Sequence, residues 1–361
     1  MKLERIPYAE KKNTTVEQIQ TIGGQIIEVP RFDYPIDPRE NFRRVLERDL
    51  PMWVPTAATD FNYTLGGTLT GLADLRFDFK DRCDWTDMFG CVWEWIPEAG
   101  GSMLKPGAKP VIEDITRWKE EIVWPELNEK QIKQCCESYM NQSYYHPERM
   151  NYFDFGQGCT ERLVAVLGGY QEAMIAFAEE PEACKDFMTQ LSYFHCEMLD
   201  KILKYFPADL IMYHDDWGTE RDTFFSSEMM ENIVYEPNEI FFRHTQKRGV
   251  KMVFHCCGNI KRFVPYMIEL GPDFLQLQAR ANDLCSFKKQ FGHRLGFDAV
   301  IRGTTEAETA ASMHKQVDEL AKDGGMMSTV FAIGEDALWG GLQELYCYSR
   351  GYYSESLELP V

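Results

Sequence analysis

The chain lacks a run of about 20 apolar residues, the length that a helix needs to cross a bilayer. Its N-terminus also lacks the apolar core of a signal peptide, so we expect a cytoplasmic protein without a membrane anchor. Positive charge is scarce, because 38 Lys and Arg face 57 Asp and Glu, for a net charge of −19. Binding to nucleic acid or to an anionic membrane needs an excess of cations, which excludes both as partners.

No glycine-rich loop of the P-loop or dinucleotide-binding type follows any predicted strand, and no internal repeat is present. Cysteine, by contrast, is plentiful, with eleven residues. An odd number cannot pair fully within the chain, and no export signal precedes them. We therefore expect free thiols or metal ligands, not a disulfide framework.

Strands and helices alternate through the second half of the chain. Five short runs of β-formers are separated by helical segments: 210–213, 251–254, 274–278, 295–297 and 329–333. Alternation of this kind indicates a parallel sheet. With residues 52–55 as a first strand, the pattern predicts an α/β fold with a single (β/α)8 TIM barrel, and an open doubly wound sheet is the second choice.

The barrel domain is expected over residues 38–361, because Asp37 and Pro38 signal the N-cap and first position of a helix. Residues 1–37 are polar and are expected to form an N-terminal arm. Residues 64–150 are irregular and rich in turn signals, which indicates a long early insertion over a site.

The strongest chemical signal is the run 250–254, which leads into His255-Cys256-Cys257-Gly258. His255 and Cys257 are two residues apart, so at the end of a strand they point to the same side. An imidazole and a thiolate held in this way suit zinc, and a site with three protein ligands would be catalytic. A buried strand end with inert thiols is the alternative, because one His-x-Cys pattern is common.

A third zinc ligand is expected after another strand. Glu335 follows the last predicted strand, which in a closed barrel adjoins the first and faces the same opening. Cys285 is the rival, but it lies within a helical pattern, where an inert cysteine is the simpler interpretation. We favour Glu335.

Polar and aromatic residues follow several other predicted strands. His214-Asp215-Asp216-Trp217 forms one such group, and adjacent aspartates point to opposite sides, so one would face the pocket and the other would cap a loop. A structural role is the alternative for His214. The remaining candidates are Asp60, Asn62, Tyr63, Trp93 and Gln278.

Four segments carry a family resemblance: 38–42 (PRENF), 87–93 (DMFGCVW), 213–218 (YHDDWG) and 253–258 (VFHCCG). Together they resemble the uroporphyrinogen decarboxylase superfamily and, within it, the zinc-dependent methyltransferases that serve corrinoid proteins. The resemblance implies a TIM barrel. It also implies zinc bound by His255, Cys257 and a residue after the last strand, where the family has cysteine and this chain has Glu335.

Two departures from the family narrow the function. The decarboxylases grip their polyanionic substrate with an Arg-Gln-Ala-Gly-Arg-Tyr motif, whereas residues 57–63 contain no arginine, which argues against uroporphyrinogen as substrate. A carboxylate ligand at Glu335 would leave a harder, more Lewis-acidic zinc than a thiolate would. Such a metal suits the oxygen of a methyl ether.

The resulting hypothesis is a methyltransferase that moves a methyl group from a small donor to the cobalt of a corrinoid (cobalamin) carried by a partner protein. A methoxylated aromatic donor is favoured, with methanol, methylamine and methyl thiol as the other candidates. Asp215 or Asp216, with Asp60 and Tyr63, would orient the donor or supply a proton. The residues expected to contact the donor are His214, Trp217, Asn62, Trp93 and Gln278.

Two alternatives stay open. One is a metal-free, decarboxylase-like lyase in which Asp87 or Asp60 protonates the substrate carbon. The other is a barrel that binds a ligand without turning it over. For each of these three hypotheses, the oligomeric state considered is a homodimer.

Overall fold

The computed structural model describes residues 15–21, 25–72, 81–97, 101–303, 305–332 and 335–356, with the backbone alone for residues 306, 331–332, 335–337 and 354–356. No helix in these ranges is both long enough and apolar enough to span a bilayer.

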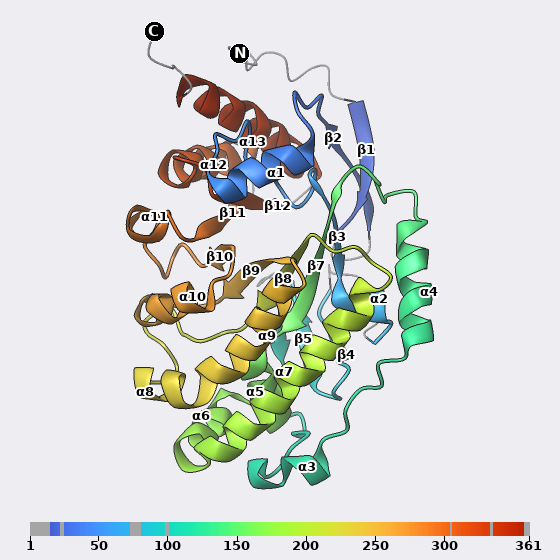
Figure 1. The fold of residues 1–361 in the computed structure, drawn as a ribbon, viewed down its shortest axis with the longest axis vertical. Coiled ribbons are helices and arrows are strands. Elements are labelled where there is room, and N and C mark those ends of the chain that lie inside the picture. The colour runs from blue at the N-terminus through green and yellow to red at the C-terminus, as the bar shows by residue number, and fades with distance from the viewer. Residues whose placement is uncertain are drawn as a thin grey trace.

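A curled parallel sheet of seven strands forms the centre of the described structure, in the order β12-β11-β10-β9-β8-β7-β3 (Figure 1). Its strands are β3 (Phe61–Leu65), β7 (Met150–Gln157), β8 (Leu210–His214), β9 (Lys251–Cys256), β10 (Phe274–Leu277), β11 (Gly296–Gly303) and β12 (Met326–Ala332). Between the two edge strands, Thr56 forms a parallel bridge with Ser328 of β12. The predicted TIM-barrel-like α/β fold is thereby confirmed.

Helices follow the strands and lie along the outside of the sheet (Figure 1). The longer ones are α1 (Pro38–Glu47), α4 (Glu129–Met140), α5 (Cys159–Leu167), α6 (Tyr170–Glu179), α7 (Pro181–Leu203), α9 (Tyr235–Lys247), α10 (Val264–Leu270), α11 (Leu284–Phe291), α12 (Glu306–Leu320) and α13 (Glu335–Ser356). The short ones are α2 (Gly66–Thr70), α3 (Trp118–Glu121), α8 (Ser227–Met229), the 3₁₀ turns Ile115–Arg117 and Lys261–Phe263, and the π turn Met230–Val234. The expected cap of α1 is confirmed, because the Asp37 carboxylate accepts a hydrogen bond from Arg39 N at 2.7 Å.

The described part of the N-terminal segment is a β-hairpin and not a free arm. Strands β1 (Thr15–Gln20) and β2 (Ile26–Arg31) pair antiparallel. Glu17 of β1 forms an ion pair with Arg149, just before β7, and both side chains are buried. The segment is therefore tied to the barrel by a charge pair that is largely shielded from water.

The early insertion contains an antiparallel sheet of three strands. Its strands are β4 (Cys83–Thr86), β5 (Val92–Ile96) and β6 (Gly101–Leu104). The aromatic run of residues 152–155, which the sequence pattern left unassigned, lies in barrel strand β7.

The first barrel strand is not where the sequence placed it. Residues 52–55 are not a strand, and β3 begins only at Phe61. Met52 and Trp53 are apolar because they pack against Tyr346 of α13 in a small separate core, and Pro55 has no N–H to donate to a strand partner. Burial against a helix therefore imitates a strand pattern here. As a result, Asp60 and Asn62 lie at the amino end of β3.

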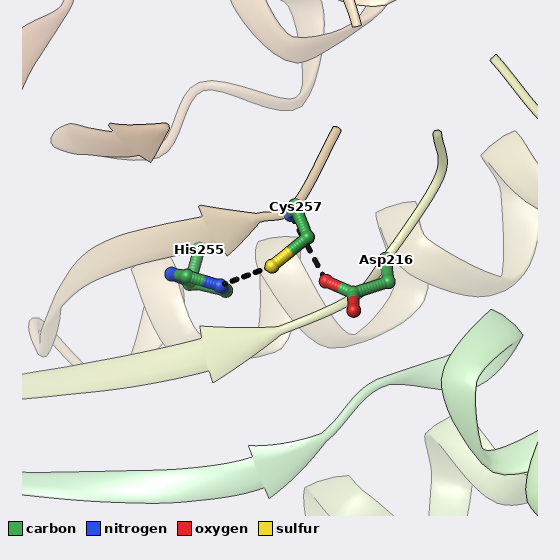
Figure 2. Close-up of side chains that lie close together, drawn as sticks. All are labelled: Asp216, His255 and Cys257. Carbon is green, nitrogen blue, oxygen red and sulfur yellow. Dashed lines mark hydrogen bonds between the residues drawn. The ribbon is translucent and has the colours of Figure 1, made fainter. Parts of the chain in front are cut away.

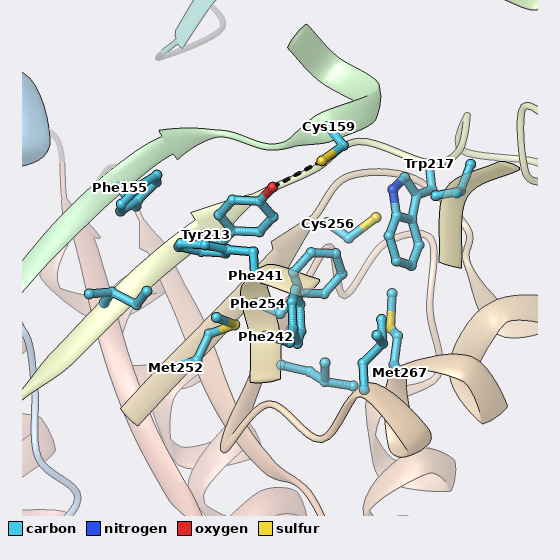
Figure 3. Packing of buried hydrophobic residues seen from close by; sticks show 14 of the residues in the cluster. Phe155, Cys159, Tyr213, Trp217, Phe241, Phe242, Met252, Phe254, Cys256 and Met267 are labelled. Atoms are coloured by element: carbon cyan, nitrogen blue, oxygen red, sulfur yellow. Dashed lines mark hydrogen bonds between the residues drawn. The ribbon is translucent and has the colours of Figure 1, made fainter. Parts of the chain in front are cut away.

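Apolar side chains fill the barrel on both sides of the sheet. The amino end of the interior is closed by a cluster that includes Phe42, Phe61, Tyr152, Met212, Val253, Phe274 and Met327. Behind β8 and β9, fully buried aromatic residues of α9 pack on Tyr213 and Phe254 (Figure 3). This packing holds the carboxyl ends of β8 and β9 rigidly in place, and that end of the barrel is where TIM-barrel enzymes place their sites.

Candidate metal centre

Three potential metal ligands meet at the carboxyl ends of two neighbouring strands. Asp216 follows β8, while His255 and Cys257 lie at the end of β9, and each contributes one donor atom to a group whose atoms lie within 4.8 Å of one another (Figure 2). His255 Nε2 is 3.3 Å from Cys257 Sγ, and Asp216 Oδ1 accepts a hydrogen bond from Cys257 N at 2.9 Å. Nitrogen, sulfur and carboxylate oxygen are the donors that zinc takes in catalytic sites.

A glutamine fixes the orientation of the histidine. Gln276 on β10 places Oε1 2.7 Å from His255 Nδ1, and its Nε2 donates to Asp298 Oδ2 at 2.7 Å. Because the amide is anchored by Asp298, Nδ1 of His255 must be the protonated nitrogen, and Nε2 keeps its lone pair toward Cys257. Burial, followed by the nearby charge of His214, lowers the pKa of His255 to about 4, so its ring is neutral and ready to bind a cation.

The thiol of Cys257 is also held on two sides. Gln278 Nε2 donates to its sulfur at 3.0 Å, while Gln278 Oε1 accepts from Gly258 N. Burial and the Asp216 charge raise the pKa of Cys257, because the thiolate would be a second negative charge in a shielded place. A divalent cation would remove this penalty, since a bound metal deprotonates a ligating thiol.

Two glycines bring the β8 and β9 loops together. Gly258 has a φ of +83°, and a Cβ there would lie 2.0 Å from the carbonyl oxygen of Gly218. A Cβ on Gly218 would lie 2.8 Å from Asn259 O. The Asp-Asp-Trp-Gly and His-Cys-Cys-Gly motifs therefore end in glycine because only glycine permits this close approach.

The two adjacent aspartates have different surroundings. Asp215 is fully buried and accepts hydrogen bonds from Glu161 N at 2.7 Å, Thr160 N at 3.2 Å and Trp217 Nε1 at 2.8 Å. It thus caps the first turn of α5 from a neighbouring strand. Trp217 is also fully buried and packs on Phe254 and Phe263. In this arrangement neither side chain can touch a substrate. It therefore does not support the catalytic role expected for Asp215 or the substrate contact expected for Trp217.

His214 lies beside the cluster, with its ring centroid 4.5 Å from that of His255. Its Nε2 is 3.0 Å from Asp154 Oδ2 on β7, and the hydroxyl of Tyr63 lies 3.4 Å from the same oxygen. Burial lowers the pKa of His214, but the Asp154 carboxylate outweighs it and raises the value to about 9. The ring is therefore protonated at neutral pH, next to the site.

Several sequence-predicted residues lie elsewhere. Asp60 accepts hydrogen bonds from Trp53 Nε1, Thr56 N and Thr59 Oγ1 at the amino end of β3. Asn62 bonds both backbone groups of His146 near the same end. The side chain of Glu335 lies outside the described residues. Cys285 is on α11 and is not part of the cluster.

An aromatic cavity of about 230 Å³ adjoins the cluster at His214. Trp93 lines it, with its Nε1 donating to Asp87 at 2.8 Å, and the cavity also reaches Asp154 and Glu161. Burial and the Asp216 charge raise the pKa of Glu161 well above its usual range. Sequence reasoning missed Asp154, Glu161 and Gln276. Asp154 and Gln276 lie in strands, so the alternation of side chains that predicted the side to which His255 points could have been applied to them too.

A buried histidine on the cavity wall predicts acid sensitivity. Burial, followed by the nearby Arg162 charge, lowers the pKa of His195 to about 3. The unfolded chain protonates near pH 6.5 and the folded chain does not, so stability is complete above pH 6.5 and falls by about 1.4 kcal/mol per pH unit as the pH drops toward 3. We expect His195→Phe to reduce this slope by about 1.4 kcal/mol per pH unit in urea unfolding between pH 7 and pH 5, while His255, whose pKa is also lowered by burial, keeps its own contribution. An unchanged slope in the variant would contradict the assignment.

The chain is similar to known proteins in part of its sequence and in its fold. The family model of uroporphyrinogen decarboxylase (URO-D) matches residues 162–306. No curated protein sequence matches the chain. Among solved structures, a methyltransferase from Methanosarcina mazei superposes with a TM-score of 0.53 at 10% identity, over 90% of this chain and 100% of that one. An intracellular xylanase from Thermoanaerobacterium saccharolyticum reaches a TM-score of only 0.30 at 8% identity, over 56% of this chain and 69% of that one, which is too low to carry an argument.

The matched residues run from α5 to the start of α12 and include Asp216, His255 and Cys257. At 10% identity, the likeness to the methyltransferase structure shows the fold alone. The sequence motifs and the family match point the same way: residues 162–306 of the chain are related to the uroporphyrinogen decarboxylase superfamily.

Proposed function

We propose that the protein is a zinc-dependent methyltransferase that moves a methyl group from a small donor with an oxygen, nitrogen or sulfur atom to the cobalt of a corrinoid carried by a partner protein. The observation that carries the proposal is the meeting of Asp216, His255 and Cys257 at the carboxyl ends of β8 and β9, next to an aromatic cavity. A methoxylated aromatic is the favoured donor, because two tryptophans and three phenylalanines contribute to the cavity wall.

The donor set fits zinc in charge as well as in type. With zinc bound, Asp216 and Cys257 would contribute two negative charges and His255 a neutral nitrogen, which balances a divalent ion. Gln276 and Gln278 already hold His255 and Cys257 from behind, as the outer partners of metal ligands do. Zinc in this place would act as a Lewis acid on the donor's heteroatom and make the demethylated product a better leaving group.

The side chains around the cluster would supply the proton and position the donor. His214, paired with Asp154, lies beside His255 and is the group placed to give a proton to the alkoxide or phenolate product. Tyr63 contacts Asp154 and so helps to fix that pair. The cavity would hold the rest of the donor and exclude water. In this proposal His214 takes the role that the sequence assigned to Asp215, Asp216 or Asp60.

A decarboxylase-like lyase is the second candidate, because the family model that matches the chain is that of a decarboxylase. Its expected acids are poorly placed for it. Asp60 lies at the opposite end of β3, and Asp87 is paired with Arg162. Release of CO₂ without metal would favour this candidate over the methyltransferase.

Methyl transfer to reduced free cobalamin tests the proposal directly. Protein loaded with zinc would be mixed with cob(I)alamin and with methoxylated aromatics, methanol, methylamine or a methyl thiol in turn. We expect Cys257→Ser to reduce the rate of cobalt methylation by more than about 100-fold, because one of the protein's metal ligands is lost. Methylation is read from the loss of the cob(I)alamin absorption.

Cys285→Ser is the matched control, because Cys285 is also half-buried but lies outside the cluster. We expect it to retain full activity. Full activity in Cys257→Ser, or equal losses in both variants, would contradict the proposed role of the cluster.

A further inference from the structure

The aromatic cavity has the size of a single ring. It lies between the carboxyl ends of β3 and β7, the β4–β6 sheet and helices α5 and α7. Its volume is about 230 Å³. An engineered protein cavity of about 150 Å³ is known to bind benzene, so this one has room for a benzene ring with one or two small substituents.

Five aromatic rings contribute to its wall. Trp85 and Trp93 stand nearly parallel on neighbouring strands of the β4–β6 sheet, with centroids 6.0 Å apart, and Phe89, Phe155 and Phe194 also line the cavity. Flat aromatic walls bind flat aromatic ligands through offset and edge-to-face contacts.

The charged groups on the wall cancel in pairs. Asp87 and Arg162 form an ion pair with both side chains 4% exposed, and Asp154 pairs with His214 at 3.0 Å. Glu161 and His195 are the other two ionisable groups on the wall, and burial favours the uncharged form of each, because it raises the pKa of Glu161 and lowers the pKa of His195. Among the described residues that line the cavity, no cation is left over to balance an anionic ligand.

One donor on the wall is unpaired. Arg162 gives Nη1 to Asp87 and Nη2 to Gln157, but its Nε is buried and has no hydrogen-bond partner in the described part of the chain. A neutral acceptor, such as a ring hydroxyl, is enough to satisfy this N–H. A carboxylate would also accept it, but at the same time it would face Asp87 and Asp154 in a place shielded from water.

From these observations we propose that the cavity is a binding site for uncharged, single-ring aryl methyl ethers and that it rejects rings bearing a carboxylate. The inference rests on the proposed function, because it names the class of the methyl donor. The methoxy group would point toward His214, where the cavity meets the metal cluster, and the ring hydroxyl would lie toward Arg162.

Calorimetric titration with two ligands of similar shape tests the charge preference. 2-Methoxyphenol is neutral at pH 7, whereas 2-methoxybenzoate is ionised, since phenols titrate near 10 and carboxylic acids near 4. We expect the purified protein to bind 2-methoxyphenol at least about tenfold more tightly. Equal or tighter binding of 2-methoxybenzoate, or no binding of 2-methoxyphenol, would overturn the proposal.

Two variants locate the effect. In Asp87→Asn the Arg162 charge is no longer cancelled, so the preference for the neutral ligand should fall toward equality through tighter binding of 2-methoxybenzoate. Since Asp87 also accepts from the backbone of its own turn, Trp85→Leu gives an independent check. It should weaken 2-methoxyphenol binding about tenfold, whereas Trp95→Leu, on the same small sheet but off the cavity wall, should not.

The titration needs neither corrinoid nor methyl transfer, so it separates two kinds of failure. Tight binding of 2-methoxyphenol without methyl transfer would support the proposed binding site and contradict the methyltransferase proposal. Methyl transfer from other donors without binding of 2-methoxyphenol would support the methyltransferase proposal and contradict the proposed binding site.

Discussion

Zinc content is expected to fall from about one ion per chain to about a tenth or less in Asp216→Ala, and to stay near one in Glu335→Ala. Asp216 and Glu335 are the rival third ligands of the metal centre. Asp216 lies with His255 and Cys257 in a single cluster, whereas Glu335 was chosen only because it follows the last strand. Removing an outer partner of a metal ligand typically costs 10- to 100-fold in affinity, so the loss of a ligand itself should exceed that range.

Elemental analysis of protein purified without chelator, followed by competition with a chelator of known affinity, measures this effect. Asp222→Ala is the matched control, because Asp222 is an exposed aspartate on the same β8 loop that pairs with Arg262. Zinc lost from Glu335→Ala and kept in Asp216→Ala would return the third ligand to the position expected from the sequence. Zinc kept in both variants would mean that Asp216 and Glu335 are each dispensable.

The strand ends of the second half of the barrel were predictable from sequence. Strands β8, β9 and β10 begin at the predicted residues, because each is a short run of β-formers bounded by helices. Side chains alternate along a strand, which predicted that His255 and Cys257 point to the same side of it. The two side chains are in contact in the structure. Two-residue periodicity is a local property, which a single sequence reveals.

The same alternation separated Asp215 from Asp216, but it did not say which of the two joins the metal cluster, because Asp216 lies in a loop two residues past the end of β8. Its position depends on the pairing of β8 with β9, in which His214 lies opposite His255, and on the hydrogen bond from Cys257 N. Both are contacts between segments about 40 residues apart. The misplacement of Asp60 and Asn62 has a different cause, since Met52 and Trp53 are buried against α13 and the apolar pattern that results resembles a strand.

Asp215→Ala is expected to destabilise the fold by about 3 kcal/mol while leaving the zinc in place. The Asp215 carboxylate satisfies two backbone N–H groups at the start of α5 and the buried indole N–H of Trp217. Loss of a helix cap costs about 1 kcal/mol, and an indole N–H left buried without a partner costs about 1–3 kcal/mol more. Urea unfolding at pH 7 measures the difference in the free energy of unfolding.

The neighbouring aspartate is the natural control for this effect. Asp216 is half-buried and accepts a hydrogen bond from the backbone of Cys257, so Asp216→Ala in metal-free protein should change stability by no more than about 1 kcal/mol. The two variants should therefore show opposite patterns, with stability lost and zinc kept in Asp215→Ala, and zinc lost and stability largely kept in Asp216→Ala. If both variants lost zinc and stability together, Asp215 and Asp216 would act as one unit. The division between a structural aspartate and a metal-binding aspartate would then be wrong.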